Sequence, residues 1–320
     1  MAENEVDRQL EGILQSLPEP EKSAGIFLFG ESSYVLSSNK DQGIEGFSRT
    51  FAHLEIKDSS SQEIRVLILE KTPRLPREIK VGYESGSFSA SMDFHSQTVI
   101  ISDWNNRVTY LLSTNNSFDF GRPDLARASA QALFDSDYFA IHGGLIAWEE
   151  DSGVLITAKG GSGKSSTVAA CVRNGSMTAG DDFLMAQFTN ETTIRGYSLF
   201  SSVRLAPESP EHSLMKKDPV TSHDGKDTFD LKDLSAKAVV GSLGIKSLVV
   251  PKVSNTTSLR EISKRSALLA IAPSSIGLST NKPKSMSFIA KMVEKTPCYE
   301  LLLGPDGDEN ARQLMLLGEQ

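Results

Sequence analysis

Cysteine is scarce in this sequence, and no long apolar run is present. Only Cys171 and Cys298 occur among its 320 residues, and their spacing fits neither a disulfide framework nor a metal site. We expect both to be small buried side chains rather than nucleophiles. No window approaches the ~20 apolar residues that cross a bilayer, and residues 1–12 lack the apolar core of a signal peptide. The sequence therefore predicts a cytoplasmic protein without a membrane partner.

Positive charge is also in short supply. The chain has 33 lysine and arginine residues against 41 aspartate and glutamate residues, which gives a formal net charge of −8. A protein that holds nucleic acid mainly by neutralising phosphates needs a basic face. The composition therefore argues against a nucleic-acid partner and is ordinary for a soluble globular protein of one large or two smaller domains.

A glycine-rich turn near the middle of the chain is the most informative motif. Residues 158–165 read Ala-Lys-Gly-Gly-Ser-Gly-Lys-Ser, after an apolar run at 154–156 and before a helical pattern at 166–172. Glycines let backbone N–H groups converge on phosphate oxygens, and the helix presents its positive end to them. The residues expected to bind a nucleotide triphosphate are Gly160, Gly161, Ser162, Gly163, Lys164, Ser165 and Ser166, with Lys164 on the phosphates and Ser165 on Mg²⁺.

One position departs from the usual pattern G-x-x-x-x-G-K-[ST]. Ala158 replaces the first glycine, so that turn must use a backbone conformation that alanine tolerates. The alternative is a chance glycine-rich turn, which the flanking strand and helix patterns disfavour. The motif predicts nucleotide binding but no particular reaction.

Two adjacent acids follow this turn closely. Asp181 stands 17 residues after Lys164 (181 − 164), with Asp182 next to it, so we expect both carboxylates near the phosphates. One carboxylate beside Mg²⁺ and a second that accepts a proton are the minimum for phosphoryl transfer to an alcohol. The alternative, in which Asp181 caps a turn and Asp182 lies in solvent, stays open.

Other phosphate-loop classes leave traces that this sequence lacks. Residues 281–284 read Asn-Lys-Pro-Lys, but Lys284 stands where a guanine-reading motif needs an aspartate. An ABC-type signature is also missing. The sequence therefore disfavours a GTPase and a transport ATPase.

Several segments together resemble the catalytic core of HPr kinase/phosphorylase and of its stand-alone relatives, which include lasso-peptide kinases. These segments are 141–145 (Ile-His-Gly-Gly-Leu), the glycine-rich turn, 180–182 (Gly-Asp-Asp) and 197–205, with a looser match at 297–301. That core shares its fold with phosphoenolpyruvate carboxykinase. Residues 1–85 match nothing that we can place.

The resemblance implies an ATP- and Mg²⁺-dependent kinase that acts on a serine or threonine hydroxyl. It makes Asp181 the base, assisted by His142, and places Asp182 with Ser165 on the metal. The residues themselves leave open which aspartate has which role, and His142 is equally readable as a structural histidine. Arg204 is expected to neutralise phosphate or substrate charge, with a solvated strand-end arginine as the alternative.

The acceptor is only broadly defined. The sequence after Arg204 lacks the recognition sequence of true HPr kinases, so neither HPr as a substrate nor phosphorylase activity is expected. A serine of a peptide or protein is the favoured acceptor. A small-molecule hydroxyl kinase, a nucleotide-binding regulatory or assembly module with little catalysis, and a homo-oligomer all stay open.

The predicted fold is α/β. A phosphate-loop kinase core of phosphoenolpyruvate-carboxykinase/HPr-kinase type is expected over 86–320, after a small α+β region over 1–85.

Residues 207–230 show almost no apolar periodicity and are predicted to be a long loop, in which Lys216, Lys217 and Lys226 are candidates to close over a ligand. Strands are predicted at 25–30, 64–69, 97–102, 107–112, 138–146, 153–157, 177–188, 248–253 and 299–303, and helices at 123–134, 166–175, 263–271 (stopped by Pro273) and 286–293.

Overall fold

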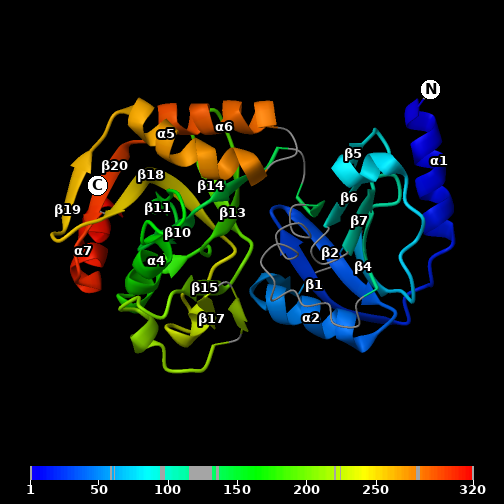
Figure 1. The fold of residues 1–320 in the computed structure, drawn as a ribbon, viewed down its shortest axis with the longest axis horizontal. Coiled ribbons are helices and arrows are strands. Elements are labelled where there is room, and N and C mark those ends of the chain that lie inside the picture. Colours follow the sequence, from blue (N-terminus) through cyan, green and yellow to red (C-terminus); the bar gives the residue numbers. More distant parts are fainter. Residues whose placement is uncertain are drawn as a thin grey trace. The chain divides into compact units, whose positions relative to one another are not determined.

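In this computed structural model, the described residues of the chain form a mixed α/β protein with three sheets (Figure 1). It divides into two compact units, Met1–Asp135 and Ser136–Gln320. This division differs from the expected boundary at residue 85, because strands between residues 88 and 113 pair into the sheet of the first unit. The described residues are 2–57, 60, 62–93, 98–114, 132–134, 137–219, 221–223, 225–278 and 282–318.

The first unit is built on an eight-stranded sheet with the order β3-β1-β2-β4-β8-β7-β6-β5. The pairs β2–β4 and β4–β8 are parallel, and the other neighbours are antiparallel. Its elements are α1 (Ala2–Gln15), β1 (Lys22–Phe29), β2 (Ser32–Ser38), α2 (Asp41–Phe51), η1 (Ala52–Leu54), β3 (Glu55–Ile56), β4 (Gln62–Ile68), η2 (Arg77–Val81), β5 (Tyr83–Glu84), β6 (Phe88–Asp93), β7 (Thr98–Asp103) and β8 (Val108–Ser113).

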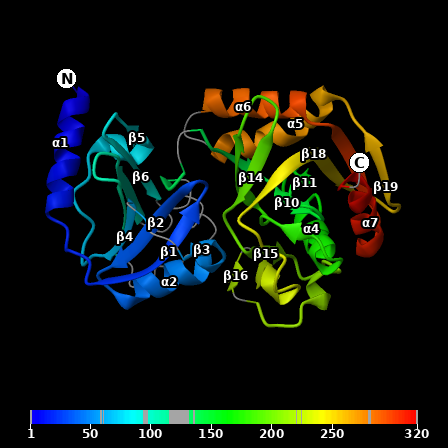
Figure 2. The same cartoon turned by 180° about the vertical axis from the view of Figure 1, so that it is seen from behind.

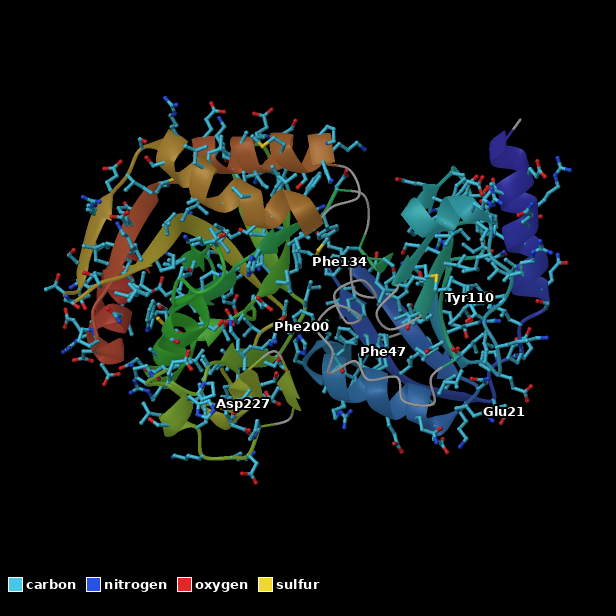
Figure 3. The ribbon with its side chains drawn as sticks, in the orientation of Figure 1. Glu21, Phe47, Tyr110, Phe134, Phe200 and Asp227 are labelled. Carbon is cyan, nitrogen blue, oxygen red and sulfur yellow. The ribbon has the colours of Figure 1, made fainter. Side chains whose placement is uncertain are left out.

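Aromatic side chains join α2 to this sheet. Phe47, labelled in Figure 3, lies on α2 with its ring centroid 5.2 Å from that of Phe27 and 4.6 Å from that of Phe51. Helix α1 contributes Val6 and Leu10 to a second apolar cluster with residues of β4, β6, β7 and β8. The first unit therefore has its own apolar core, as expected of a separate domain.

The second unit is built on a nine-stranded sheet. Its main order is β12-β10-β11-β18-β14-β13-β9, with β20 beside β18 and β19 beside β20. The pairs β11–β18 and β18–β20 are parallel. Its strands are β9 (Phe139–His142), β10 (Gly144–Ala147), β11 (Gly153–Ile156), β12 (Met177–Thr178), β13 (Phe183–Phe188), β14 (Ile194–Ser198), β18 (Ser242–Val253), β19 (Ser258–Glu261) and β20 (Cys298–Leu303).

Helices cover both faces of this sheet (Figures 1 and 2). Helices α5 (Lys264–Ser275) and α6 (Lys282–Lys295) share one apolar cluster with Leu155, and α4 (Lys164–Arg173) and α7 (Gly307–Gly318) share another with Val154 and Ile156. Side chains alternate between the two faces of a strand. A strand buried on both faces is a continuous apolar run, which is why residues 154–156 stood out in the sequence.

A separate three-stranded sheet contradicts the predicted loop at 207–230. It has the order β15-β17-β16, with β15 at Ser202–Leu205, β16 at Thr221–His223 and β17 at Lys226–Asp230. Phe229 on β17 is 2% exposed and packs with Val203 and Leu205 in the core beside α4. Phe229 anchors β17 through contacts with residues that are distant in the sequence, and a single apolar residue produces no apolar periodicity from which a strand could be predicted.

Helix α5 also corrects the sequence analysis. It was expected to stop before Pro273, yet it continues to Ser275 with Pro273 inside it. Proline removes the hydrogen bond to the carbonyl four residues earlier, which belongs to Leu269. Leu269 is 66% exposed, so water can reach that position and reduce the cost.

The remaining predicted elements fall mostly where expected. The strands near 25–30, 64–69, 107–112, 153–157 and 299–303 and the helices near 166–175 and 286–293 are confirmed. The strand predicted at 138–146 is divided into β9 and β10 at Gly143. Most of the helix predicted at 123–134 lies outside the described residues. Within the described ranges, no helix combines the length and apolar character that a membrane span needs.

Candidate functional site

The glycine-rich turn connects β11 to α4, in the strand, loop and helix order that the sequence predicts. Helix α4 begins at Lys164, directly after Gly163. Gly161 and Gly163 have φ values of 77° and 91°, and a Cβ at Gly163 would lie 2.4 Å from Leu303 Cδ1. Ala158 has no positive φ, so alanine is tolerated at the first motif position. The turn therefore uses glycine where backbone geometry requires it.

Lys164 is held inside this turn. Its side chain is 6% exposed, and Nζ donates hydrogen bonds to the carbonyls of Ala158 (2.9 Å) and Lys159 (3.2 Å). Burial lowers the pKa of Lys164, the charges of Asp181 and Asp182 act in the opposite direction, and the positive charge of Lys226 lowers it further. The ammonium group is therefore fixed near both acids.

The serines of the turn have different surroundings. The hydroxyl of Ser162 is buried without a hydrogen-bond partner among the described residues. Ser165 lies in the first turn of α4, where its hydroxyl helps to lower the pKa of Asp181. Ser166 Oγ lies 2.8 Å from Ser209 Oγ, a partner that the sequence analysis missed because Ser209 falls in the predicted loop. Gly160 is exposed.

Asp181 is completely buried beside the start of α4. The preceding Gly180 has a φ of 106°, and a Cβ there would lie 2.6 Å from the carbonyl oxygen of Phe200. Neither carboxylate oxygen of Asp181 has a hydrogen-bond partner of full geometry among the described residues, although the Ser165 hydroxyl lies close enough to stabilise its charge. Burial raises the pKa of Asp181 to about 6, the charge of Asp182 adds to this, and Ser165 and Lys164 oppose it.

Asp182 lies between two basic side chains. His142 Nε2 is 3.2 Å from Oδ1, and Arg204 Nη1 is 4.0 Å from Oδ2. Burial would raise the pKa of Asp182, but the hydrogen bond and charge of His142, the charge of Arg204 and that of Lys164 outweigh it and lower the pKa. The side chain of Asp182 is 25% exposed. Asp182 is therefore ionised and accessible, whereas its neighbour Asp181 is buried.

The backbone around His142 fixes this pair. His142 ends β9 and pairs with Phe183 of β13, and the two rings stack with centroids 5.4 Å apart. The carbonyl of His142 accepts a hydrogen bond from Thr157 Oγ1 (2.8 Å), and its N–H donates to Ser275 Oγ (3.1 Å). Thr157 and Ser275 were not singled out in the sequence. Of the two, only Thr157 could have been found from the sequence, because it directly precedes the glycine-rich turn.

The three lysines of the predicted loop have separate environments. Lys216 and Lys217 are exposed, and Lys217 pairs with Asp233. Lys226 is instead the first residue of β17 and is half-buried. Of these three lysines, only Lys226 is therefore held by a strand and near Lys164 of the glycine-rich turn.

A buried ion pair joins the end of α4 to the segment after β15. Glu211 is 4% exposed and accepts from Arg173 Nε and Nη2, both at 3.2 Å. Arg173 Nη2 also lies 2.7 Å from Asp308 of α7. Together with the contact between Ser166 and Ser209, these interactions hold the small sheet against α4. No local sequence pattern predicts these interactions, since the partners lie far apart in the chain.

The residues at the start of α4 fit a bound magnesium–phosphate group. Asp181 presents two buried oxygens without full hydrogen bonds, and Ser162 presents a third polar atom of this kind. Among the described residues no cluster of three or more His, Cys, Asp or Glu side chains is arranged to hold a metal by itself. Mg²⁺ bound through one or two protein oxygens, phosphates and water does not need such a cluster.

Comparisons with known proteins give a distant likeness among solved structures. No protein-family model matches the chain, and no curated protein matches its sequence. Among solved structures, the chain is similar to the Hpr(Ser) kinase/phosphatase from Coxiella burnetii, with a TM-score of 0.30 and 12% sequence identity. The match covers 56% of this chain and 95% of the other. Values this low carry no argument about activity, so the function has to be inferred from the site itself.

Proposed function

We propose that the second unit is an ATP- and Mg²⁺-dependent kinase that transfers the γ-phosphate to a hydroxyl, with a serine of a peptide or protein as the favoured acceptor. The observation that carries this proposal is the buried carboxylate of Asp181 beside Lys164 and Ser165. A buried charge without full hydrogen bonds is costly for a folded protein. It is explained if a cation completes its surroundings when nucleotide binds.

The phosphate side of the site consists of the glycine-rich turn and the start of α4. Backbone N–H groups at a helix N-terminus favour an anion, and Gly161 and Gly163 let the backbone approach it closely. Lys164 contributes a fixed positive charge. Ser165 and Asp181 would hold Mg²⁺, which when bound neutralises the negative charge of the phosphates during transfer.

The acceptor side consists of Asp182, His142 and Arg204. We infer that Asp182 accepts the proton of the acceptor hydroxyl, which is the reverse of the assignment that the sequence resemblance implied. Asp182 is ionised and partly accessible, whereas Asp181 is buried against the residues of the phosphate loop. A depressed pKa makes Asp182 a weaker base but is compatible with this role, because positioning and charge neutralisation contribute most of the catalysis in phosphoryl transfer.

The reaction then has a simple balance. The acceptor oxygen forms a bond to the γ-phosphorus, its proton passes to Asp182 Oδ, and the bond between the γ-phosphorus and the β,γ-bridging oxygen breaks to release ADP. His142 holds Asp182 in position and stabilises its charge. Arg204 supplies a guanidinium for the oxygens of the transferred group, a geometry that suits phosphate.

The test is transfer from γ-labelled ATP to candidate serine-containing peptides, proteins and small alcohols in the presence of Mg²⁺. Lys164→Ala, Asp181→Asn and Asp182→Asn are compared with Asp151→Asn, which makes the same chemical change at an exposed position. We expect the unmodified protein and the Asp151 variant to label the acceptor at the full rate and the other three variants to label it far more slowly. Asp182→Asn should lower the rate by roughly 10²- to 10⁴-fold, the usual contribution of a general base.

Binding separates the roles of the two aspartates. We expect Asp182→Asn to keep Mg²⁺-dependent ATP binding and to lose transfer, while Asp181→Asn loses the Mg²⁺-dependence of ATP binding. Binding of ATP without transfer to any acceptor, unaffected by either change, would support a regulatory nucleotide-binding module. Label found only on small alcohols would point to a metabolite kinase.

A further inference from the structure

The polar face of the three-stranded sheet has two positively charged side chains, Arg204 and Lys226. Arg204 of β15 pairs with Thr228 of β17, and Lys226 lies two residues before Thr228 on the same strand. Directly paired residues, and residues two apart, have side chains on the same face of a sheet. Arg204, Thr228 and Lys226 therefore share one face.

The opposite face of this sheet is apolar and packed. Val203, Leu205 and Phe229 all belong to the core beside α4. Asp227 shares that face and lies 2.8 Å from His212; it is labelled in Figure 3. The carboxylate next to Lys226 in the sequence is thus directed away from it and paired with another residue.

Contacts tie this face to the reacting groups. Arg204 lies 4.0 Å from Asp182, while the apolar face of β15 packs on α4. The charge of Lys226 is near enough to disfavour the charged form of Lys164. Lys164 and Arg204 therefore lie near the two acids, and Lys226 lies near Lys164.

The positive charge of Lys226 is not neutralised by a paired carboxylate within the described ranges. Among the described residues, no carboxylate forms an ion pair with it. Two ammonium groups that repel each other are destabilising unless an anion lies between them. A polyphosphate is an anion with enough charge to neutralise both, whereas a solvated lysine on a flexible loop would need no such ligand.

We propose that Lys226 is a second phosphate-binding cation of this site, which holds the γ-phosphate of the bound nucleotide together with Arg204. The inference rests on the proposed function, since it assumes that a nucleotide triphosphate occupies the glycine-rich turn. It assigns β15 and β17 to substrate binding through Arg204 and Lys226. Lys164 then serves the phosphates from the turn, and Lys226 serves the terminal phosphate from the small sheet.

The experiment is equilibrium binding of a non-hydrolysable ATP analogue and of ADP, each with Mg²⁺. The variants are Lys226→Met, Lys226→Arg and Lys237→Met, the last of which removes an exposed lysine and so controls for net charge. Loss of a charge-assisted contact weakens binding by about 10- to 100-fold. We expect this loss for the ATP analogue with Lys226→Met, unchanged ADP binding, and recovery of most affinity in Lys226→Arg.

Other results overturn the inference. If Lys226→Met binds both nucleotides as the unmodified protein does, or weakens both equally, Lys226 does not contact the γ-phosphate, and the proposed function is unaffected. If Lys237→Met produces the same selective loss, the effect is one of overall charge. If the unmodified protein binds neither nucleotide, the proposed function fails and this inference fails with it. Thermal melts of each variant show whether the fold is retained.

Discussion

His142 and Asp182 form a close pair at the end of neighbouring strands, with Nε2 of the histidine 3.2 Å from Oδ1 of the aspartate. The pairing of β9 with β13 places the two side chains together, because His142 lies opposite Phe183. The main chain adds a second link, since the N–H of Gly143 donates to the carbonyl of Asp182 (3.1 Å). This relationship makes the pH dependence of activity a test of the proposed acceptor side.

We predict that His142→Gln moves the acidic limb of the pH–rate profile to higher pH. The histidine lowers the pKa of Asp182, so its removal raises that pKa, and less of the carboxylate is ionised at any acidic pH. The measurement is kcat/KM as a function of pH. Phe183→Leu is the matched variant, because it removes the stacked ring without changing charge and should leave the limb in place. An unchanged limb in His142→Gln would exclude Asp182 as the group that titrates.

We predict that Asp181→Asn changes the pH dependence of stability. The pKa of Asp181 is about 6 in the folded protein and about 3.9 when unfolded. The folded state therefore binds this proton more tightly, and the free energy of unfolding falls as pH rises from about 4 to about 6, by roughly 3 kcal/mol for this group. Asparagine cannot titrate. Urea denaturation at pH 4 and pH 7.5 should show a smaller fall in the variant, and an equal fall in both proteins would contradict the prediction.

We predict that Gly180→Ala is more harmful than Gly175→Ala. Both glycines have positive φ values, 106° and 90°, but a Cβ at Gly175 meets nothing within 4 Å, whereas one at Gly180 lies 2.6 Å from the carbonyl of Phe200. Gly175→Ala should cost roughly 1–2 kcal/mol from backbone strain alone, and Gly180→Ala should add about 1–3 kcal/mol from the clash. Chemical denaturation measures both. Equal costs would show that the contact with Phe200 is relieved easily.

We predict that the ion pair between Arg173 and Glu211 stabilises the fold. Glu211→Ala leaves the guanidinium without its buried partner and should lower the free energy of unfolding by about 2–4 kcal/mol. Asp308→Ala removes the other, half-exposed partner of Arg173 and should cost less than about 1 kcal/mol. Denaturation of both variants gives the comparison. A small effect of Glu211→Ala would mean that water replaces its carboxylate.

The strand–turn–helix order around the glycine-rich turn, and the acids beside it, could be predicted because they are local in sequence. The strand, the glycines at positions that need positive φ, and the helix beginning at Lys164 are adjacent segments, and each has a recognisable pattern. Asp181 and Asp182 follow after one helix, so the short separation from Lys164 was enough to place them. The position of His142 beside Asp182 came from the resemblance rather than from a local pattern.

What could not be predicted depends on pairing between distant strands. The first unit extends to Asp135 because β4 pairs with β8, and no local feature of either strand identifies its partner. The pattern at 207–230 predicts a loop where β16 and β17 form, because Phe229 is the only large apolar residue at 226–230 and finds its contacts on β15 and α4. The environments of Asp181 and Asp182 differ through such contacts, which is why the sequence left their roles open.

Thr157 connects the glycine-rich turn to His142 and to the central strand through two hydrogen bonds. Its N–H donates to the carbonyl of Val249 on the central strand, and its hydroxyl donates to the carbonyl of His142. The next residue, Ala158, begins the glycine-rich turn. Thr157 therefore links the start of the glycine-rich turn directly to the backbone of His142, so a displacement of the turn by a bound ligand would act on the histidine through this hydrogen bond.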